Sequence, residues 1–394
     1  MQAKRPAPLL FTPLTLRALT VKNRVVISPM CQHAADADGS ANDWHLVHLG
    51  KFALGGAGLI FTEGIAVSPH GRIGLRDLGL WSDAHVAPLR RVVEFVHGQG
   101  AAIGAQLAHA GRKAGSHALW DGGAAFTAAE LAAAGMRRLG PSSIAAGPEW
   151  TVPETLDASG IIAIVESFVA AARRADAAGF DAVELHFGHG YLVPSFLSPL
   201  SNHREDGYGC DRMLLAREIA AAVRAVWPKE RPLFVRISAV DGAADSWGLD
   251  DSVVLARDLA RIGVDVIDVS SGGLSEETRR IAIPRGLGFQ LDYAATIRRE
   301  AGVTVQAVGM IVDGPQAEAA LRDGAADLIA VGREALRDPY WAHHAAEQLG
   351  GRPAYETWPV RHGAWLLKRE EHMGDILRAR RAYLHEEAEH GRDD

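Results

Sequence analysis

The chemistry in this sequence is concentrated in the segment HFGHGY at residues 186–191, which carries two imidazoles and a phenol. The segment follows a short apolar run, so we expect His186, His189 and Tyr191 to lie at the end of a strand. Two imidazoles can bind an oxygen on which negative charge develops, and a phenol can deliver a proton. A metal site is less well supported, because the segment lacks the helical glutamate of a zinc protease and no third ligand follows closely. The alternative is a purely structural role, in which a hydrogen-bonded histidine pair ends a strand. The position at a strand end favours the functional interpretation.

Other polar groups interrupt or follow further apolar runs. The segment QLAHAGRK at residues 106–113 combines an amide, an imidazole and two cations, which suits a flat anionic heteroaromatic; an exposed basic turn is the alternative. Arg236 lies inside an apolar run and needs a partner, since an unpaired buried guanidinium is costly. A bound anion and a carboxylate of the same barrel are the two candidate partners. Cys31 follows the first run; it is either a small buried hydrophobe or a thiol that tunes a redox cofactor, and no local base supports a nucleophilic role.

Glycines follow the last two apolar runs, in Gly309-Met310 and in Gly332-Arg333. Barrels commonly bind phosphate after their seventh and eighth strands, through backbone N–H groups and a helix N-terminus. These observations fit a phosphorylated planar cofactor, of which FMN is the best candidate. Pyridoxal phosphate would need a Schiff-base lysine, and Lys113 is the one well-placed candidate.

The elements that must position these groups alternate regularly along the chain. We expect strands at eight apolar runs, namely residues 24–29, 58–62, 102–107, 182–186, 233–237, 264–269, 303–308 and 328–331. Helical patterns lie between them, for example at 158–178, 213–226, 251–262, 316–323 and 339–349. This order predicts an α/β fold, a (β/α)₈ TIM barrel, with a doubly wound sheet as the alternative.

Two long loops and a tail complete this organisation. The loops at residues 111–155 and 272–289 follow strands, so we expect both on the catalytic face. We expect a single FMN-binding barrel over residues 1–350, and over residues 351–394 a linker and a charged tail that is helical from 366 to 390.

Composition narrows the class of protein. A formal net charge of −7 argues against a nucleic-acid-binding surface. The two cysteines, Cys31 and Cys210, are too few for a disulfide scaffold and suit a reducing cytosol. The first residues lack the apolar region of a signal peptide, and no apolar run reaches the roughly 18 residues of a membrane span. We therefore expect a cytoplasmic enzyme that contacts neither nucleic acid nor membrane.

Several ordered motifs together resemble the Old Yellow Enzyme family of FMN-dependent ene-reductases, in the thermophilic-like branch that carries a cysteine near the flavin. They are SPMC at 28–31, QLAHAGRK at 106–113, HFGHGY at 186–191, SPLSN at 198–202, VRI at 235–237 and VGR at 331–333, and the resemblance runs from residue 10 to about 365. It implies ping-pong reduction of the activated C=C bond of α,β-unsaturated carbonyl, nitro or thioester compounds. It also implies NADPH or NADH as reductant, a small-molecule substrate, and a homodimer or homotetramer.

The resemblance also implies roles for single residues. His186 and His189 would bind the substrate oxygen, Tyr191 would donate the proton, and Cys31 would modulate the flavin potential. His33, Lys113 and Arg361 would contact substrate, Arg361 from a neighbouring subunit. The residues expected to hold FMN are Ser28, Pro29, Met30, Cys31, Gly64, Gln106 and Arg236, with Gly309, Met310, Gly332 and Arg333 at its phosphate.

The chain also departs from the family pattern. His33 replaces the usual tyrosine, which would make substrate binding pH-sensitive near neutrality. The segment at Cys210 is shortened, and the tail beyond residue 365 exceeds the usual end. Two alternatives therefore stay open. One is an FMN-dependent isomerase, desaturase or reductase of a dearomatised or CoA-linked intermediate; the other is a non-catalytic flavin-binding or scaffold protein on the same barrel.

Overall fold

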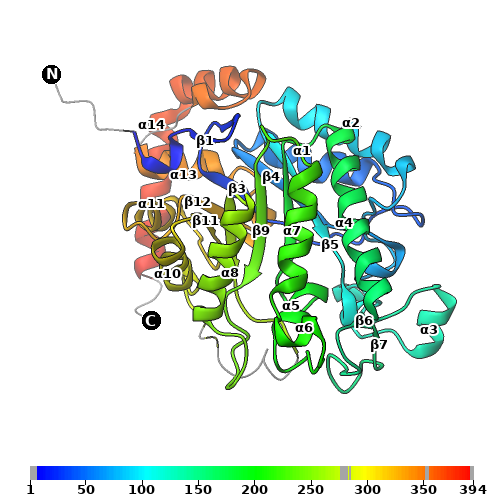
Figure 1. The fold of residues 1–394 in the computed structure, drawn as a ribbon. Coiled ribbons are helices and arrows are strands. Elements are labelled where there is room, and N and C mark those ends of the chain that lie inside the picture. Colours follow the sequence, from blue (N-terminus) through cyan, green and yellow to red (C-terminus); the bar gives the residue numbers. More distant parts are fainter. Residues whose placement is uncertain (1–6, 276–282, 284, 351–354, 391–394) are drawn as a thin grey trace.

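Eight parallel strands close into a barrel in the order β10-β11-β12-β3-β4-β5-β8-β9 (Figure 1). The computed structural model describes residues 7–275, 283, 285–350 and 355–390, with the backbone alone at 381, 382 and 384–390. The barrel strands are β3 (Val25–Ile27), β4 (Leu59–Ala66), β5 (Ala102–Ala108), β8 (Ala182–Phe187), β9 (Leu233–Ser238), β10 (Val266–Ser270), β11 (Thr304–Ala307) and β12 (Leu328–Val331). Each falls on one of the eight apolar runs, so the barrel is confirmed and the doubly wound alternative is wrong.

Helices cover the outside of the barrel between successive strands (Figure 1). The longer ones are α1 (Asp43–Leu54), α2 (Val86–Gly98), α4 (Ala158–Ala178), α7 (Leu214–Val226), α8 (Leu249–Ile262), α10 (Leu291–Ala301), α11 (Gly314–Arg322) and α13 (Trp341–Gly350). Helices α4 and α8 end at Gly179 and Gly263, whose φ angles of +93° and +106° are left-handed. Such glycines let the chain turn directly from a helix into the next buried strand.

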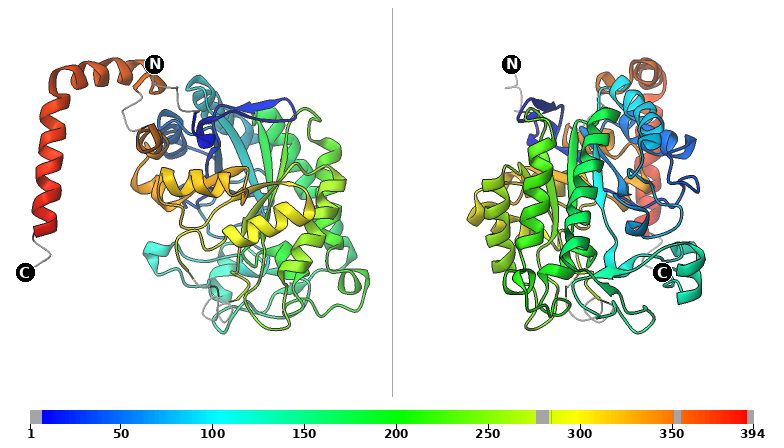
Figure 2. Two further views of the ribbon diagram at one scale, coloured as in Figure 1. Left: turned by 90° about the vertical axis from the view of Figure 1, so that its left-hand side faces the viewer. Right: turned by 45° about the vertical axis from the view of Figure 1, so that its right-hand side comes forward.

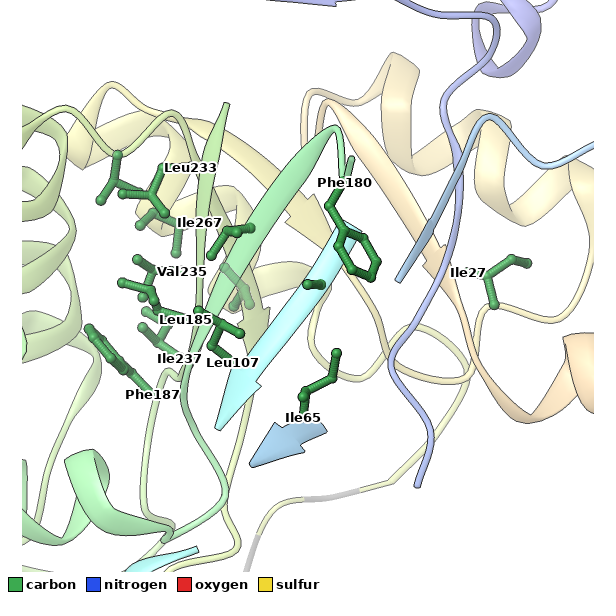
Figure 3. Packing of buried hydrophobic residues seen from close by; sticks show 14 of the residues in the cluster. Ile27, Ile65, Leu107, Phe180, Leu185, Phe187, Leu233, Val235, Ile237 and Ile267 are labelled. Atoms are coloured by element: carbon green, nitrogen blue, oxygen red, sulfur yellow. The ribbon is translucent and has the colours of Figure 1, made fainter. Parts of the chain in front are cut away.

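Apolar side chains fill the space between the strands and the helices. Alternate residues of β8 and β9, such as Leu185, Phe187 and Val235, point away from the barrel axis into this layer (Figure 3). A second apolar cluster, which includes Phe61 and Phe234, lies inside the barrel. Leu16 and Val21 join that inner cluster from the hairpin of β1 (Leu14–Leu16) and β2 (Leu19–Val21), which therefore closes the N-terminal end of the barrel. The opposite, C-terminal end is left for a site.

Short elements build that C-terminal end. They are α3 (Ala128–Ala133), α5 (Leu192–Leu197), α6 (Gly207–Cys210), α12 (Arg333–Arg337), the strands β6 (Leu139–Gly140) and β7 (Glu154–Thr155), and the 3₁₀ turn η4 (Gly111–Lys113). Strands β6 and β7 pair in parallel within the long loop that follows β5. Both long loops expected on this face do follow barrel strands, and the described part of the second one includes residues 272–275.

The C-terminal tail is one helix, α14 (Val360–His390), which begins earlier than residue 366, where the sequence predicted it. It packs on the 3₁₀ turn η6 (Tyr355–Thr357), and the next residue, Trp358, stacks on His343 of α13 at 4.4 Å between ring centroids. The first part of α14 lies at the end of the barrel that holds the β1–β2 hairpin, and its last part stands away from the barrel (Figure 2). Among the described residues, no helix combines the length and apolarity that a membrane span requires.

Candidate active site

Polar side chains occupy the inward positions near the C-terminal ends of the barrel strands. Because successive side chains of a strand point to opposite faces, Glu184 and His186 point inward where Leu185 and Phe187 point outward (Figure 3). On the neighbouring strand β9, Arg236 pairs in register with His186 and, on its other side, with Asp268 of β10. Closure of the barrel thus brings together, on neighbouring strands, residues that are up to about 50 positions apart in the sequence. We call the space inside the C-terminal end of the barrel, into which these side chains point, the chamber.

The two histidines of the HFGHGY segment lie in direct contact. His186 Nε2 is 3.3 Å from His189 Nδ1, and their rings cross at 75°. The backbone N–H of Gly188 donates to His186 Nδ1, so the proton of this imidazole is on Nε2. Burial, with Arg236 and Lys113 adding to it, lowers the pKa of His186 to about 3 and that of His189 well below its usual value. Both imidazoles are therefore neutral near pH 7.

A strained turn aims His189 and Tyr191 at the chamber. His189 has a left-handed φ of +61°, and its N–H donates to Ser238 Oγ at 2.8 Å. The next residue, Gly190, also has a positive φ, of +71°, and a Cβ there would lie 2.4 Å from the carbonyl oxygen of Gly273. Tyr191 then caps α5, with its ring 5.2 Å from that of His186. A left-handed non-glycine residue costs about 1 kcal/mol or more, and such strain is typical of functional positions.

Lys113 and Arg112, the two cations after β5, donate hydrogen bonds to backbone carbonyl oxygens of other loops. Lys113 Nζ donates to the carbonyl oxygens of His189 and Gly273 and lies 5.5 Å above the Tyr191 ring. Arg112 is buried and donates to the carbonyl oxygen of Leu274 at 2.9 Å. An exposed basic turn, the alternative for this segment, is therefore wrong. Lys113 ties together the loops that follow β5, β8 and β10.

Arg236 has a carboxylate partner inside the barrel. Its Nε lies 3.3 Å from Asp268 Oδ2, and its Nη1 donates to Ser28 Oγ at 3.1 Å. Of the two partners that the sequence suggested, the barrel carboxylate is thus present. The Ser28 contact brings the guanidinium to the end of β3, where Pro29, Met30 and Cys31 follow.

Cys31 and His33 lie at the rim of the chamber. Although Cys31 is exposed to solvent, many protein atoms surround it, and this burial, with the charges of Asp77 and Glu63, raises the pKa of its thiol well above the usual value. Cys31 is therefore a neutral thiol near pH 7. His33 Nδ1 lies 2.8 Å from Asp77 Oδ1, and this hydrogen bond raises the pKa of His33. The imidazolium form of His33 is thus favoured close to the site.

Backbone N–H groups at the ends of β11 and β12 suit a phosphate. Within the described residues, the N–H groups of Gly309, Met310 and Gly332 donate to no other group, and Arg333 begins α12 beside them. Gly309 has a φ of +130°, and a Cβ there would lie 2.9 Å from Gln290 Nε2. Backbone N–H groups without a hydrogen-bond partner in the protein are what an anion-binding backbone requires. These residues fit the phosphate of FMN.

Residues of β4 and β5 suit the isoalloxazine ring of the flavin. A Cβ on Gly64 would approach Gln106 Oε1 to 3.3 Å, so the glycine keeps the amide of Gln106 open to a ligand. With Ser28 and Arg236 opposite, this donor and acceptor set fits the pyrimidine edge of an isoalloxazine.

Sequence reasoning missed several polar residues that share this chamber. They are Ser238 and Ser270, which bond the His189 backbone and ring, and the buried Glu184, Asp268, Gln290 and Gln306. The pattern that could have revealed four of them is a polar residue at every second position of an apolar strand, as in ELH, RIS and DVS. Arg361, by contrast, is the second residue of α14, a helix whose first part lies at the other end of the barrel (Figure 2). Cys210 is exposed at the end of α6.

A parallel eight-stranded barrel with unbonded backbone N–H groups after its last two strands and polar groups above its core is an architecture that suits a flavin-dependent oxidoreductase. Residues 9–351 match the family described as "NADH:flavin oxidoreductase / NADH oxidase". The chain belongs to this family, which includes the Old Yellow Enzymes. It is accordingly an FMN-dependent oxidoreductase that takes its electrons from NADPH or NADH.

Relatives and solved structures agree with that assignment. The chain is 45% identical over 346 residues to an NADPH dehydrogenase of Geobacillus sp. (strain WCH70), with 87% of this chain and 95% of the relative covered. It is 43% identical over 344 residues to an NADPH dehydrogenase of Bacillus subtilis (strain 168), with coverage of 86% and 95%. Morphinone reductase superposes with a TM-score of 0.73 at 27% identity, covering 89% of this chain and 91% of that one. An Old Yellow Enzyme homologue from Zymomonas mobilis gives 0.72 at 26% identity, with coverage of 90% and 96%.

Proposed function

We propose that this enzyme reduces the activated C=C bond of α,β-unsaturated carbonyl compounds, or of related nitro or thioester compounds. The observation that carries the proposal is the pair of neutral, touching histidines, His186 and His189, with the Tyr191 ring beside them. FMN, held by Ser28, Gln106, Arg236 and the backbone N–H groups after β11 and β12, would supply the hydride chemistry that links the nicotinamide to the β-carbon of the substrate. The histidine N–H groups bind the oxygen on which enolate charge develops, and Tyr191 gives a proton to the α-carbon.

Neutral imidazoles suit this role, because each can present an N–H without bringing a full charge that would need its own counter-ion. His186 presents Nε2–H, since its Nδ1 accepts a hydrogen bond from Gly188. His189 can present Nδ1–H to the same point only if its Nε2 accepts a hydrogen bond. Ser270 Oγ lies 2.7 Å from that nitrogen and would donate to it on turning away from Gln290 Oε1, which it bonds at 3.5 Å in the structure. When the substrate oxygen replaces the contact between the two imidazoles, Ser270 would thus select the tautomer in which both N–H groups converge on that oxygen.

Replacing Ser270 with alanine is expected to lower kcat/KM for an enone by about fivefold, because one hydrogen bond worth ~1 kcal/mol no longer selects the His189 tautomer. Steady-state kinetics on FMN-saturated enzyme measure this effect. The control is Ser271→Ala at the next position, whose hydroxyl instead donates to Gln290 Oε1 at 2.6 Å. Equal effects of the two substitutions would contradict a tautomer role for Ser270.

The charge on His33 is expected to make binding of anionic substrates pH-dependent. Because Asp77 raises the pKa of His33, the imidazolium persists above pH 6.5 and is lost as pH rises further. For an enone that bears a carboxylate, KM should rise several-fold from pH 6 to pH 9, while a neutral enone shows little change. In His33→Tyr the two substrates should show the same pH dependence of KM. In Asp77→Asn the rise in KM for the anionic substrate should occur at lower pH than in wild type. A profile that is the same in wild type and His33→Tyr would assign the pH dependence to another group.

The net reaction is tested by anaerobic stopped-flow spectroscopy. Photoreduced enzyme is mixed with a panel of enones, nitroalkenes and unsaturated thioesters, and reoxidation of the flavin is followed. Rapid reoxidation by simple enones supports the proposal, as does a charge-transfer band on addition of p-hydroxybenzaldehyde. If no simple enone reoxidises the flavin, the redox-neutral or CoA-linked alternatives replace it.

We further propose that the enzyme is a cytoplasmic homodimer or homotetramer in which Arg361 reaches a neighbouring subunit. Because Arg361 lies at the opposite end of its own barrel, a site on another subunit is the one it can contribute to. Light scattering of the wild-type enzyme measures the assembly. A monomer with full activity would overturn this part of the proposal.

A further inference from the structure

Two carboxyl groups and one guanidinium are enclosed in the barrel beneath the histidines. Glu184 and Asp268 are completely buried, and Arg236 is 7% exposed. Glu184 precedes His186 by two residues on β8, so it lies on the same inward face, one step deeper in the barrel. Neither carboxyl group has a role in the reaction proposed above.

The hydrogen bonds of these groups leave several oxygens without a donor. Glu184 Oε1 accepts from Gln106 Nε2 at 2.8 Å, and Asp268 Oδ2 lies 3.3 Å from Arg236 Nε. Among the residues that the structure describes, no N–H or O–H group is well placed to donate to Glu184 Oε2 or to either oxygen of Asp268, although the Gln306 side chain lies beside Asp268. Buried carboxylate oxygens nearly always have a donor, so this deficit calls for an explanation.

A single proton between the two carboxyl groups gives Glu184 Oε2 and one oxygen of Asp268 a hydrogen-bond partner, and the Gln306 side chain is beside Asp268 for its other oxygen. The groups facing Glu184 are Gln106 of β5, Asp268 of β10 and Arg236 of β9, and Gln306 of β11 lies beyond Asp268. Of these, Arg236 carries the one positive charge, and His186 above them is neutral. If both carboxyl groups were ionised, the buried layer would carry a net charge of −1, which is costly away from water.

We propose that Glu184 is protonated in the resting enzyme and donates this proton to Asp268, which stays ionised and pairs with Arg236. The assignment of the proton to Glu184 follows from the position of Arg236, whose Nε is in ion-pair contact with Asp268. In agreement, burial raises the pKa of Glu184 well above the usual value, and the charge of Asp268 raises it further. Burial also raises the pKa of Asp268, but Arg236 and the hydrogen bond from Glu184 oppose that rise.

This arrangement makes Glu184 a positioning residue for the FMN site. Its Oε1 holds the Nε2 of Gln106, which leaves Gln106 Oε1 on the side of Gly64 as an acceptor for an N–H of the isoalloxazine. The proton also keeps the layer electrically neutral, so that no unbalanced negative charge lies beneath a cofactor that gains electrons. The inference depends on FMN binding and not on which substrate is reduced.

Infrared spectroscopy of the FMN-loaded enzyme tests where the proton lies. We expect a C=O stretch of a protonated carboxylic acid that persists from pH 6 to pH 9, shifts in D₂O, and shifts when glutamate but not aspartate carries ¹³C. The band should be lost in Glu184→Gln. Glu63 is a second buried glutamate, 3.3 Å from His45, so Glu63→Gln is the matched control and should retain the band. Absence of the band in wild type, a shift with labelled aspartate, or survival of the band in Glu184→Gln would overturn the proposal.

FMN affinity of the apoprotein tests the positioning role separately. Glu184→Gln should bind FMN within about twofold of wild type, because its amide oxygen still accepts from Gln106. Glu184→Leu offers no acceptor, and its FMN affinity should fall about tenfold, the effect of losing roughly one buried hydrogen bond. Far-UV circular dichroism checks that both variants are folded. Wild-type affinity in a folded Glu184→Leu enzyme would contradict the positioning role.

Discussion

Replacing both His186 and His189 with alanine is expected to lower kcat/KM for enone reduction by about 10³-fold or more, with FMN still bound. In the proposed mechanism both N–H groups bind the substrate oxygen, and removal of a single donor to a developing oxyanion typically costs 10²–10³ in rate. The flavin contacts expected at Ser28, Gln106 and the glycines of the phosphate cradle are untouched by the change. Stopped-flow reoxidation of the reduced variant by an enone measures the loss.

A matched variant separates this effect from a general loss of histidine. In His97→Ala/His372→Ala both replaced side chains are exposed; His97 lies in the last turn of α2, at the N-terminal end of the barrel, and His372 lies on α14. We expect wild-type rates for this control. If the His186/His189 variant also reduced enones at the wild-type rate, the non-catalytic flavin-binding alternative would be favoured.

The substitution Gly190→Ala is expected to lower kcat/KM by about 10²-fold without removing an obvious functional group. A Cβ at this position would lie 2.4 Å from Gly273 O and 2.5 Å from Leu274 Cα, both of them backbone atoms that no rotamer change can move. The loop after β8 must therefore shift, and it carries His189 and Tyr191 with it. A displacement of about 1 Å in a reacting group can cost 10²-fold in rate. Steady-state kinetics and the FMN content of the purified variant test this expectation.

Gly302→Ala is the control for Gly190→Ala, because Gly302 has a similar φ angle but no atoms near the position of an added Cβ. Gly302 follows α10 with a φ of +67°, against +71° at Gly190, and a Cβ there would meet nothing within 4 Å. Gly302→Ala should therefore cost about 1 kcal/mol of stability through its left-handed conformation and leave kcat/KM unchanged. Similar kinetics in the two variants would mean that the contact with Gly273 does not position the histidines.

The barrel strands were predictable because burial on both faces leaves a strong pattern in the sequence. All residues of β8 and β9 are buried, and each strand reads as a nearly continuous apolar run that follows a helix. The same pattern shows where a strand ends, and residues such as His186 and Cys31 follow from that position. The long loops were predictable as well, since they interrupt an otherwise regular repeat.

The partners of the polar residues were not predictable, because they depend on how distant strands meet. Nothing near Arg236 in the sequence indicates that Asp268 pairs with it. The same holds for Lys113, whose partners are carbonyl oxygens of two other loops. The start of α14 at Val360 was missed because its first turns gain stability from contacts with η6, not from an amphipathic pattern of their own.

The hairpin of β1 and β2 limits how substrates enter and products leave the enzyme. Because Leu16 and Val21 seal one end of the barrel with apolar contacts, molecules reach the histidines from the C-terminal end. A molecule that reaches the histidines must leave by the way it came before the next one can arrive. Residence time of the spent nicotinamide or of product therefore sets an upper limit on turnover, whatever the speed of the chemical step.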